Sequence, residues 1–303
     1  MILSNSETAC TFCGSGKTKF SKRQRRVLFE NELHSFLFCK ECLGYFMFPE
    51  LTSEQLKRMY SRNYIERESD SKILPDMEDR SRFYLLEKYL NSHSYKSTDY
   101  FLDYGCGANP ETLKIARSKN LTPIGMELAE DVREVAARNT GEQVLSREEL
   151  IHLKVEFSVI FLGDVLEHLT DPQEILYELV GLLRKDGVII SQGPLQGART
   201  LTHTLVGAYS CFTPSIKSTY PPYHVTFAHK KSMVQLFARA KIKVESIYVD
   251  EVDWPAPNFR ELRLNLNFRD MALFFSKSID KFIAKINFRY GTRYFMVGKI
   301  ENR

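Results

Sequence analysis

The sequence has no long hydrophobic run. No stretch approaches the roughly 18 apolar residues of a membrane span, and the first segment, Met1–Glu7, lacks the basic-then-apolar pattern of a secretory signal. We therefore expect a cytoplasmic location. Neither sign of charge dominates, since 42 Lys and Arg stand against 38 Asp and Glu, a net charge of +4 in 303 residues. This balance argues against a polycation built for nucleic acid, and the 43% hydrophobic content excludes a disordered chain.

Cysteine is also scarce, and four of the six cysteines stand in two pairs, Cys10-x2-Cys13 and Cys39-x2-Cys42. In a reducing compartment, paired C-x2-C knuckles indicate a metal site rather than disulfides. Four thiolates at this spacing can close a tetrahedral zinc site, which leaves no open position for chemistry. We therefore predict a structural zinc ion in a small domain over 1–50. The alternative is four unligated cysteines.

Residues 51–97 have a helical pattern. Thr52 stands three residues before Gln55, a capping-box spacing that starts a short helix. A second, amphipathic helix is expected over about 76–91. We interpret 51–97 as a helical connector to a larger domain over 98–303.

In that larger domain, short apolar strands alternate with helices. We expect strands over 100–103, 123–126, 142–145, 157–162 and 188–191, with helices between them over 110–118, 130–138 and 172–183. This alternation predicts an α/β fold with a parallel sheet and helices on both faces. In such a sheet, functional residues lie beyond the carboxyl ends of the strands.

Two glycines, Gly105 and Gly107, directly follow the first of these strands. Small residues there let the backbone approach a ligand at the start of a helix. Glu127 stands 20 positions after Gly107, at the end of the second strand, where a carboxylate can accept both hydroxyls of a ribose. The dinucleotide fingerprint G-x-G-x-x-G fails at Pro110, and there is no P-loop lysine. The pattern indicates a different nucleotide-like cofactor.

Four segments together, FLDYGCG, GMEL, FSVIFLGDVLEHLTDPQEILYELVGLLRKDGVII and HVTFAHKKSMVQLFARA, resemble class I S-adenosylmethionine-dependent methyltransferases of the ubiquinone/menaquinone-methyltransferase-like group. The resemblance covers about residues 80–250. It implies a Rossmann-like sheet of seven strands whose final strand runs antiparallel. Asn109 replaces the usual third glycine, and we expect it to cap the following helix.

The same resemblance implies where S-adenosylmethionine binds. The methionine part would lie at Asp103, Gly105 and Gly107, the ribose at Glu127, the adenine near Ser146, and the sulfonium near Gly163 and Asp164.

The segment CTFCGS…FCKECLGYFMFPELTSEQLKRMYSRNY resembles the N-terminal zinc ribbon of many bacterial methyltransferases, including sugar C-methyltransferases. The loop between the two cysteine pairs carries a run of cations. A run of this kind is most often solvated, but it could bind phosphate. An RNA methyltransferase that binds nucleic acid through the ribbon is therefore an alternative, although the modest net charge and the absence of RNP-type motifs count against it. The run comprises Lys17, Lys19, Lys22, Arg23, Arg25 and Arg26.

Methyl transfer to a hydroxyl needs an aligned acceptor and a group that removes its proton. Asp164, Glu167 and His168 begin the turn after the fourth strand. His224 resembles the histidine that a later segment contributes to the site in this group of methyltransferases. We expect His224 or His168 as the base. The four side chains also resemble the divalent-metal site of some ubiquinone-pathway and small-RNA 2′-hydroxyl methyltransferases. We favour the alternative in which Glu167 and His168 hold the loop by hydrogen bonds.

The sugar C-methyltransferases carry Tyr-x-Glu-His at this insertion, whereas this chain has Pro221-Pro222-Tyr223-His224. The missing glutamate argues against C-methylation. We therefore predict an O-methyltransferase for a small molecule, a sugar or a lipid-linked glycan. A non-catalytic binding module of the same fold is a further alternative, and the intact glycine loop counts against it.

Two insertions are expected, over 194–229 and 258–290. The first is long, irregular and rich in Pro and Gly, and such loops are usually functional. In the second, residues 270–287 predict an amphipathic helix on which Lys277, Lys281 and Lys285 stand four apart. We expect this helix to pack against the domain or against a second copy of the chain. The alternative is docking on an anionic membrane, because residues 258–303 carry ten Lys and Arg against four Asp and Glu.

Overall fold

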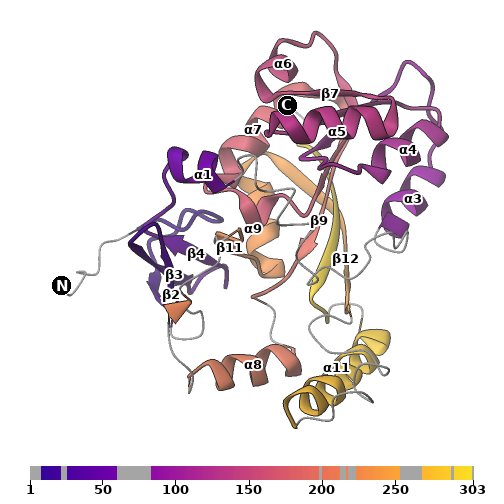
Figure 1. Cartoon of the computed structure of the whole chain (residues 1–303). Helices are drawn as coiled ribbons and strands as arrows, with labels where there is room; N and C mark the ends of the chain where they lie inside the picture. Colours follow the sequence, from indigo (N-terminus) through magenta and orange to yellow (C-terminus); the bar gives the residue numbers. More distant parts are fainter. Residues whose placement is uncertain are drawn as a thin grey trace.

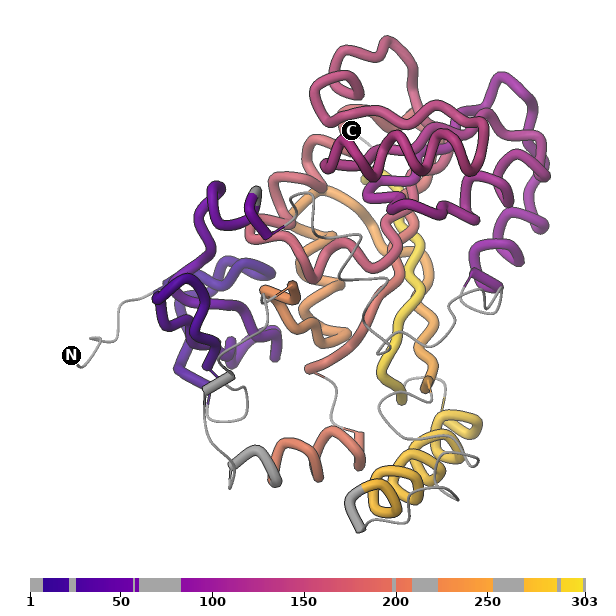
Figure 2. Tube along the Cα trace, in the orientation of Figure 1, coloured from indigo at the N-terminus to yellow at the C-terminus, as the bar shows by residue number. Residues whose placement is uncertain are grey.

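The structure is a computed structural model that describes residues 8–21, 26–59, 83–197, 200–211, 216–217, 223–252, 268–287 and 290–301. They form a larger sheet flanked by helices and a smaller sheet near the N-terminus (Figure 1). The Cα trace shows a later, orange part of the chain between the two sheets (Figure 2). None of the described helices combines the length and apolar character that crossing a bilayer requires.

The larger sheet has seven strands. They are β5 (Tyr100–Tyr104), β6 (Thr122–Met126), β7 (Gln143–Leu145), β8 (Phe157–Gly163), β9 (Leu183–Pro194), β12 (Ile242–Asp250) and β13 (Arg293–Ile300). Their order is β12-β13-β9-β8-β5-β6-β7, and β13 is antiparallel to both of its neighbours. The predicted parallel sheet with an antiparallel final strand is confirmed. The order reverses between β5 and β8, which is where ligands bind in open sheets of this kind.

Helices cover both faces of this sheet. They are α3 (Tyr84–Asn91), α4 (Glu111–Ser118), α5 (Glu130–Thr140), α6 (Arg147–His152), α7 (Pro172–Leu182) and α9 (Lys230–Arg239), and a short 3₁₀ turn, η2 (Leu166–His168), follows β8. Successive strand residues point to opposite faces. Phe101 and Phe161 therefore share one core with α3 and α4, whereas Leu102 and Ile160 share another with α7 and α9.

The smaller sheet joins the cysteine-bearing segment to strands from the first insertion. Its strands are β1 (Thr18–Phe20), β2 (Arg26–Phe29), β3 (Glu32–Cys39), β4 (Tyr45–Phe48), β10 (Ile216–Lys217) and β11 (Thr226–Phe227). Strand β11 pairs antiparallel with β4, and β10 pairs parallel with β2. The insertion therefore holds the smaller sheet at both of its edges.

Local side-chain caps start some of the helices, whereas α3, α4 and α5 have none. Helix α1 (Ser53–Met59) begins with the predicted capping box, because Gln55 N–H donates to Thr52 Oγ1 at 3.2 Å and Thr52 N–H donates to Gln55 Oε1 at 2.8 Å. The prediction that Asn109 caps the helix after β5 is wrong. Helix α4 has no side-chain cap, and Asn109 Oδ1 instead accepts a hydrogen bond from Asn139 Nδ2 at 2.5 Å.

The first insertion is more ordered than its sequence indicated. The segment 194–229, expected to be irregular, contains helix α8 (Leu201–Cys211). The reason is a distant cap: the Asp280 carboxylate accepts the N–H groups of Leu201 and Thr202, each at 2.9 Å. Asp280 belongs to helix α11 (Phe268–Ile286), which confirms the helix predicted over 270–287. No local pattern can signal a cap supplied by another insertion.

Candidate functional site

Two glycines follow strand β5 in backbone conformations that favour glycine. Gly105 has a φ of 77° and Gly107 a φ of 67°, in the left-handed region that other residues rarely adopt. A Cβ at Gly105 would lie 2.8 Å from Cγ2 of Val165, in the loop after β8, whereas a Cβ at Gly107 would meet nothing within 4 Å. The glycine loop thus packs against the end of β8 and leaves open space at Gly107.

Glu127 follows β6 and faces the glycine loop. Its Oε2 accepts the N–H of Gly107 at 3.1 Å, and its Oε1 accepts the N–H of Leu128 at 2.7 Å. Burial raises the pKa of the Glu127 carboxyl, while the backbone donors oppose that rise. The fold therefore brings the glycine loop and the acidic residue together at neighbouring strand ends, as the spacing predicted.

The other residues proposed for cofactor binding lie at the ends of nearby strands. Asp103 is buried in β5 and accepts a hydrogen bond from Thr112 Oγ1. Gly163 ends β8, and a Cβ there would lie 2.6 Å from Cε1 of Phe161. Ser146 follows β7 and caps α6 with its hydroxyl. Their contact with a cofactor stays a prediction.

His168, in η2, and His224, shortly before β11, lie side by side. Their ring centroids are 4.8 Å apart and their planes meet at 79°. His168 Nδ1 lies 2.7 Å from the carbonyl oxygen of Tyr223, and His224 Nδ1 lies 2.9 Å from Nε2 of Gln196. Burial lowers the pKa of His168 and lowers the pKa of His224 to about 4. Both imidazoles are therefore neutral near pH 7.

Three of the four candidate metal ligands converge. One ligand atom from each of Glu167, His168 and His224 lies within 4.8 Å of the others. Two imidazoles and one carboxylate form a donor set that suits divalent transition metals. Asp164, the fourth candidate, adopts a left-handed φ of 56°, and its carboxylate oxygens lie 2.7 Å and 2.9 Å from Nη2 of Arg293. The structure thus separates Asp164 from the other three by engaging it with an arginine.

Val225 connects this cluster to the smaller sheet through its backbone. Its N–H donates to the carbonyl oxygen of Glu167 at 2.9 Å, and its carbonyl oxygen accepts the N–H of Met47, also at 2.9 Å. The next residue, Thr226, pairs with Phe46 of β4. Because Val225 directly follows His224, the cysteine-bearing sheet helps to position that histidine.

The four paired cysteines converge as predicted. One ligand atom from each of Cys10, Cys13, Cys39 and Cys42 lies within 4.8 Å of the others. The Sγ atoms of Cys10 and Cys42 are 3.5 Å apart, as are those of Cys13 and Cys39. Tetrahedral zinc with bonds of about 2.3 Å holds its sulfur ligands about 3.8 Å apart. The arrangement fits a zinc ribbon.

The cysteine cluster packs directly on helix α9. Nη1 of Arg239 donates to the carbonyl oxygen of Thr11 at 3.2 Å. Phe12 and Phe46 share one hydrophobic core with Met233 of α9. The ribbon therefore packs against α9, which covers the larger sheet, and it also pairs with β11.

Two cations of the ribbon's basic run, Lys17 and Lys19, make contacts within the ribbon. Lys17 Nζ lies 2.6 Å from a carboxylate oxygen of Glu41, and Lys19 Nζ lies 5.9 Å from the ring centroid of Phe38. These contacts give the nucleic-acid alternative no further support. Arg26 begins β2, and three members of the run lie outside the described residues: Lys22, Arg23 and Arg25.

Sequence reasoning missed three residues of this region: Arg293, Tyr294 and Gln196. Arg293 begins β13 opposite Pro194, and the Tyr294 hydroxyl lies 2.9 Å from Oγ of Ser191. An antiparallel strand begins at the edge where its parallel neighbours end. The first residues of the last strand could therefore have been placed at this edge. Gln196 lies in a loop whose sequence carries no comparable signal.

Comparison with known proteins places this chain in a family. The methyltransferase domain family matches residues 78–247. A relative, the ubiquinone biosynthesis O-methyltransferase of Coxiella burnetii, is 23% identical over 155 residues, and the match covers 49% of this chain and 65% of that protein.

One solved structure shows the same fold. A chain from the complex between the Haloferax volcanii Trm112 methyltransferase activator and a methyltransferase superposes with a TM-score of 0.53 at 13% identity, covering 84% of this chain and 100% of its own. An S-adenosylmethionine-dependent methyltransferase from Archaeoglobus fulgidus has a TM-score of 0.44 at 20% identity, covering 71% of this chain and 93% of its own. The family match covers more than half of the chain and includes the glycine loop. The chain therefore belongs to the class I S-adenosylmethionine-dependent methyltransferase family of enzymes.

Proposed function

We propose that this enzyme transfers a methyl group from S-adenosylmethionine to a hydroxyl oxygen of a small molecule, a sugar or a lipid-linked glycan. The observation that carries the proposal is the adjacent pair of neutral, largely buried imidazoles of His168, after β8, and His224, before β11. A neutral imidazole can accept the proton that a hydroxyl loses when its oxygen attacks. The name of the Coxiella burnetii relative, an O-methyltransferase, supports oxygen as the acceptor atom.

The glycine loop and Glu127 are the proposed cofactor contacts. When bound, S-adenosylmethionine supplies an electrophilic methyl group on a sulfonium sulfur. The open space at Gly107 suits close approach of a ligand to the backbone. The Glu127 carboxylate retains acceptor capacity for ribose hydroxyls beyond its backbone N–H donors. The full set of proposed contacts is Asp103, Gly105 and Gly107 for the methionine part, Glu127 for the ribose, Ser146 for the adenine, and Gly163 with Asp164 for the sulfonium.

His168 is the better defined of the two candidate bases. The carbonyl oxygen of Tyr223 can only accept a hydrogen bond, so Nδ1 of His168 carries the proton and Nε2 is the acceptor nitrogen. The Gln196 amide can donate or accept, and it therefore suits either tautomer of His224. We assign proton removal to this pair, with Glu167 and Asp164 positioning the loop that carries it.

A second candidate function uses the same residues with a divalent cation. The convergence of Glu167, His168 and His224 favours it. The buried imidazoles have lowered pKa values, which suits metal binding because a ligating histidine must be neutral. In this variant the three side chains would hold the ion, which would bind the acceptor oxygen and favour its ionised form.

We also propose one structural zinc ion per chain, held by the four paired cysteines. The proposed organisation is a zinc ribbon over 1–50, a connector over 51–97 and a catalytic domain over 98–303. The pairing of β11 with β4 supports an integrated ribbon rather than a loose appendage.

The transfer is tested by mass spectrometry. The full chain is incubated with S-adenosylmethionine that carries a deuterated methyl group and with separate acceptors: catechol, a hexose and a polyprenyl-linked sugar. We expect the label on a hydroxyl oxygen of one acceptor class, and its loss in His168→Ala. The variant His152→Ala, at an exposed histidine of α6, should keep full activity. A label found only on nitrogen or carbon acceptors offered in parallel would contradict the proposal.

A further inference from the structure

Helix α11 presents its polar side to the protein and its apolar side to solvent. Ser276, Lys277 and Asp280 are at most 3% exposed, whereas Phe275 is 58% exposed and Phe282 is 66% exposed. An amphipathic helix on the surface of a globular protein ordinarily has the opposite orientation. Of the three lysines that stand four apart on this helix, Lys277 is therefore buried.

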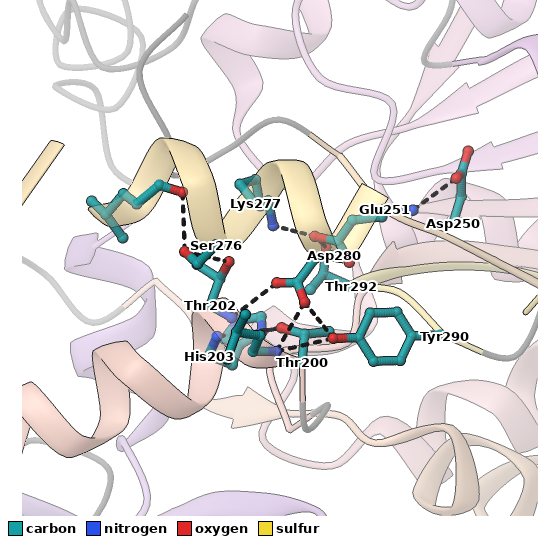
Figure 3. A network of polar contacts seen from close by, with 12 residues as sticks. Thr200, Thr202, His203, Asp250, Glu251, Ser276, Lys277, Asp280, Tyr290 and Thr292 are labelled. Carbon is teal, nitrogen blue, oxygen red and sulfur yellow. Dashed lines mark hydrogen bonds and ion pairs between the residues drawn. The ribbon is translucent and has the colours of Figure 1, made fainter. Parts of the chain in front are cut away.

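A buried polar network fixes this orientation (Figure 3). Lys277 forms an ion pair with Glu251, which also accepts a hydrogen bond from Thr292 Oγ1 at 3.0 Å. Asp280 accepts the backbone N–H groups at the start of α8 and the hydroxyl of Tyr290. Rotating α11 to bury its phenylalanines would break these contacts and leave buried charges unpaired, which is strongly unfavourable. The apolar side of α11 must therefore face outward.

Helix α8 adjoins α11 and also exposes apolar side chains. It contacts α11 through the Asp280 cap and a 3.1 Å hydrogen bond from Thr202 Oγ1 to Ser276 Oγ. Both helices lie at one end of the molecule, away from α4–α7 (Figure 1). We call this surface the α8–α11 face. Its exposed apolar residues are Leu201, Leu205 and Val206 of α8 and Met271, Phe275, Ile279, Phe282 and Ile286 of α11.

Positive charge flanks the apolar strip. Lys281 and Lys285 stand one turn apart on one side of it, and Lys285 is exposed. Among the described acidic residues of α11, Asp280 is fully buried, so Asp270 at the first turn is the remaining one. A second copy of the chain would add the same excess of positive charge. Anionic lipid headgroups would neutralise it.

We propose that the α8–α11 face docks on an anionic membrane surface, with α11 in the plane of the interface. Its phenylalanine and isoleucine side chains enter the boundary between headgroups and acyl chains, and Lys281 and Lys285 contact the headgroups. The catalytic sheet then stands above the membrane. This inference does not depend on the chemical nature of the methyl acceptor.

Co-sedimentation of the full chain with vesicles tests the proposal. We expect binding to vesicles of phosphatidylglycerol and phosphatidylcholine at low salt, weaker binding at high salt, and little binding to phosphatidylcholine alone. Phe275→Ser with Phe282→Ser should lower the partition coefficient about tenfold or more, because buried apolar area drives insertion. Lys281→Glu with Lys285→Glu should also lower it at least about tenfold, since each basic residue contributes roughly fivefold.

Matched controls use exposed residues elsewhere. Ile151→Ser on α6 and Lys243→Glu on β12 should leave vesicle binding unchanged. Thermal unfolding and binding of S-adenosylhomocysteine show whether the α11 variants remain folded. Absence of wild-type binding at low salt overturns the proposal, as does binding that survives both α11 double variants. Analytical ultracentrifugation showing a dimer that the phenylalanine substitutions dissociate, without vesicle binding, assigns the face to a second copy and also overturns it.

Discussion

Arg293 holds Asp164 at the edge of the candidate site, with Nη2 2.7 Å from one carboxylate oxygen and 2.9 Å from the other. The two residues come from the start of β13 and the end of β8. Burial lowers the pKa of the Arg293 guanidinium, but Asp164 and other nearby groups more than offset it, so that the pKa is raised. The pair fixes an aspartate that the sequence had placed near the sulfonium and among the metal ligands.

Replacing Arg293 with methionine should destabilise the fold. The change leaves Asp164 partly buried without its cation, so we expect a loss of about 1–3 kcal/mol in the free energy of unfolding, measured by urea denaturation. Lys299→Met on the same strand is the control, since Lys299 forms an exposed pair with Glu245. It should cost at most about 1 kcal/mol. Equal losses in the two variants would argue against a special role for Arg293.

Cys39→Ser should release zinc and also disturb the two candidate bases, His168 and His224. The reason is the backbone path from β4 through Val225 to Glu167. Elemental analysis should find less than one zinc ion per chain, and hydrogen exchange should show faster exchange of the Val225 amide. Cys106→Ser, outside the ribbon, should keep the zinc. Unchanged protection of Val225 after complete loss of zinc would refute the coupling.

Sequence periodicity was sufficient for the larger sheet and for the pairing of the glycine loop with Glu127. These features depend on local patterns and on the rule that parallel strands end at one edge. The contacts of Asp164 and Lys277 could not be predicted, because their partners, Arg293 and Glu251, follow from the packing of distant segments. The order in the first insertion has the same cause, since Asp280 supplies its helix cap.

Replacing either of the two histidines, His168 or His224, should lower turnover far more than it lowers cofactor affinity. His168→Ala should lower kcat by about 10²- to 10⁴-fold if it is the base, with little change in the dissociation constant of S-adenosylhomocysteine. A chelator distinguishes the metal variant. Loss of activity that Mg²⁺ or Mn²⁺ restores, with the ribbon zinc retained, would identify a catalytic cation. Full activity in the presence of the chelator would exclude the metal variant and support general-base catalysis.

Stability should fall as the pH falls through the histidine range. Burial, with a further contribution from Lys277, lowers the pKa of His203 to about 4, while Asp280 opposes the shift. Between pH about 6.5 and 4 the unfolded state therefore binds more protons, and each pH unit costs about 1.4 kcal/mol per such group. Urea midpoints should show a shallower decline in His203→Gln than in the wild type. Parallel declines would contradict the shifted pKa.

Calorimetric titration with S-adenosylhomocysteine tests the central claim most directly. Glu127 is the proposed acceptor for the ribose hydroxyls, and hydrogen bonds to a charged group contribute about 1.5–3 kcal/mol. We predict one site per chain and binding weakened by about ten- to a hundredfold in Glu127→Ala. Glu130→Ala, an exposed glutamate on the next turn, should bind normally. No binding by the wild type, or equal affinity in Glu127→Ala, would contradict a cofactor site built on this glycine loop and carboxylate.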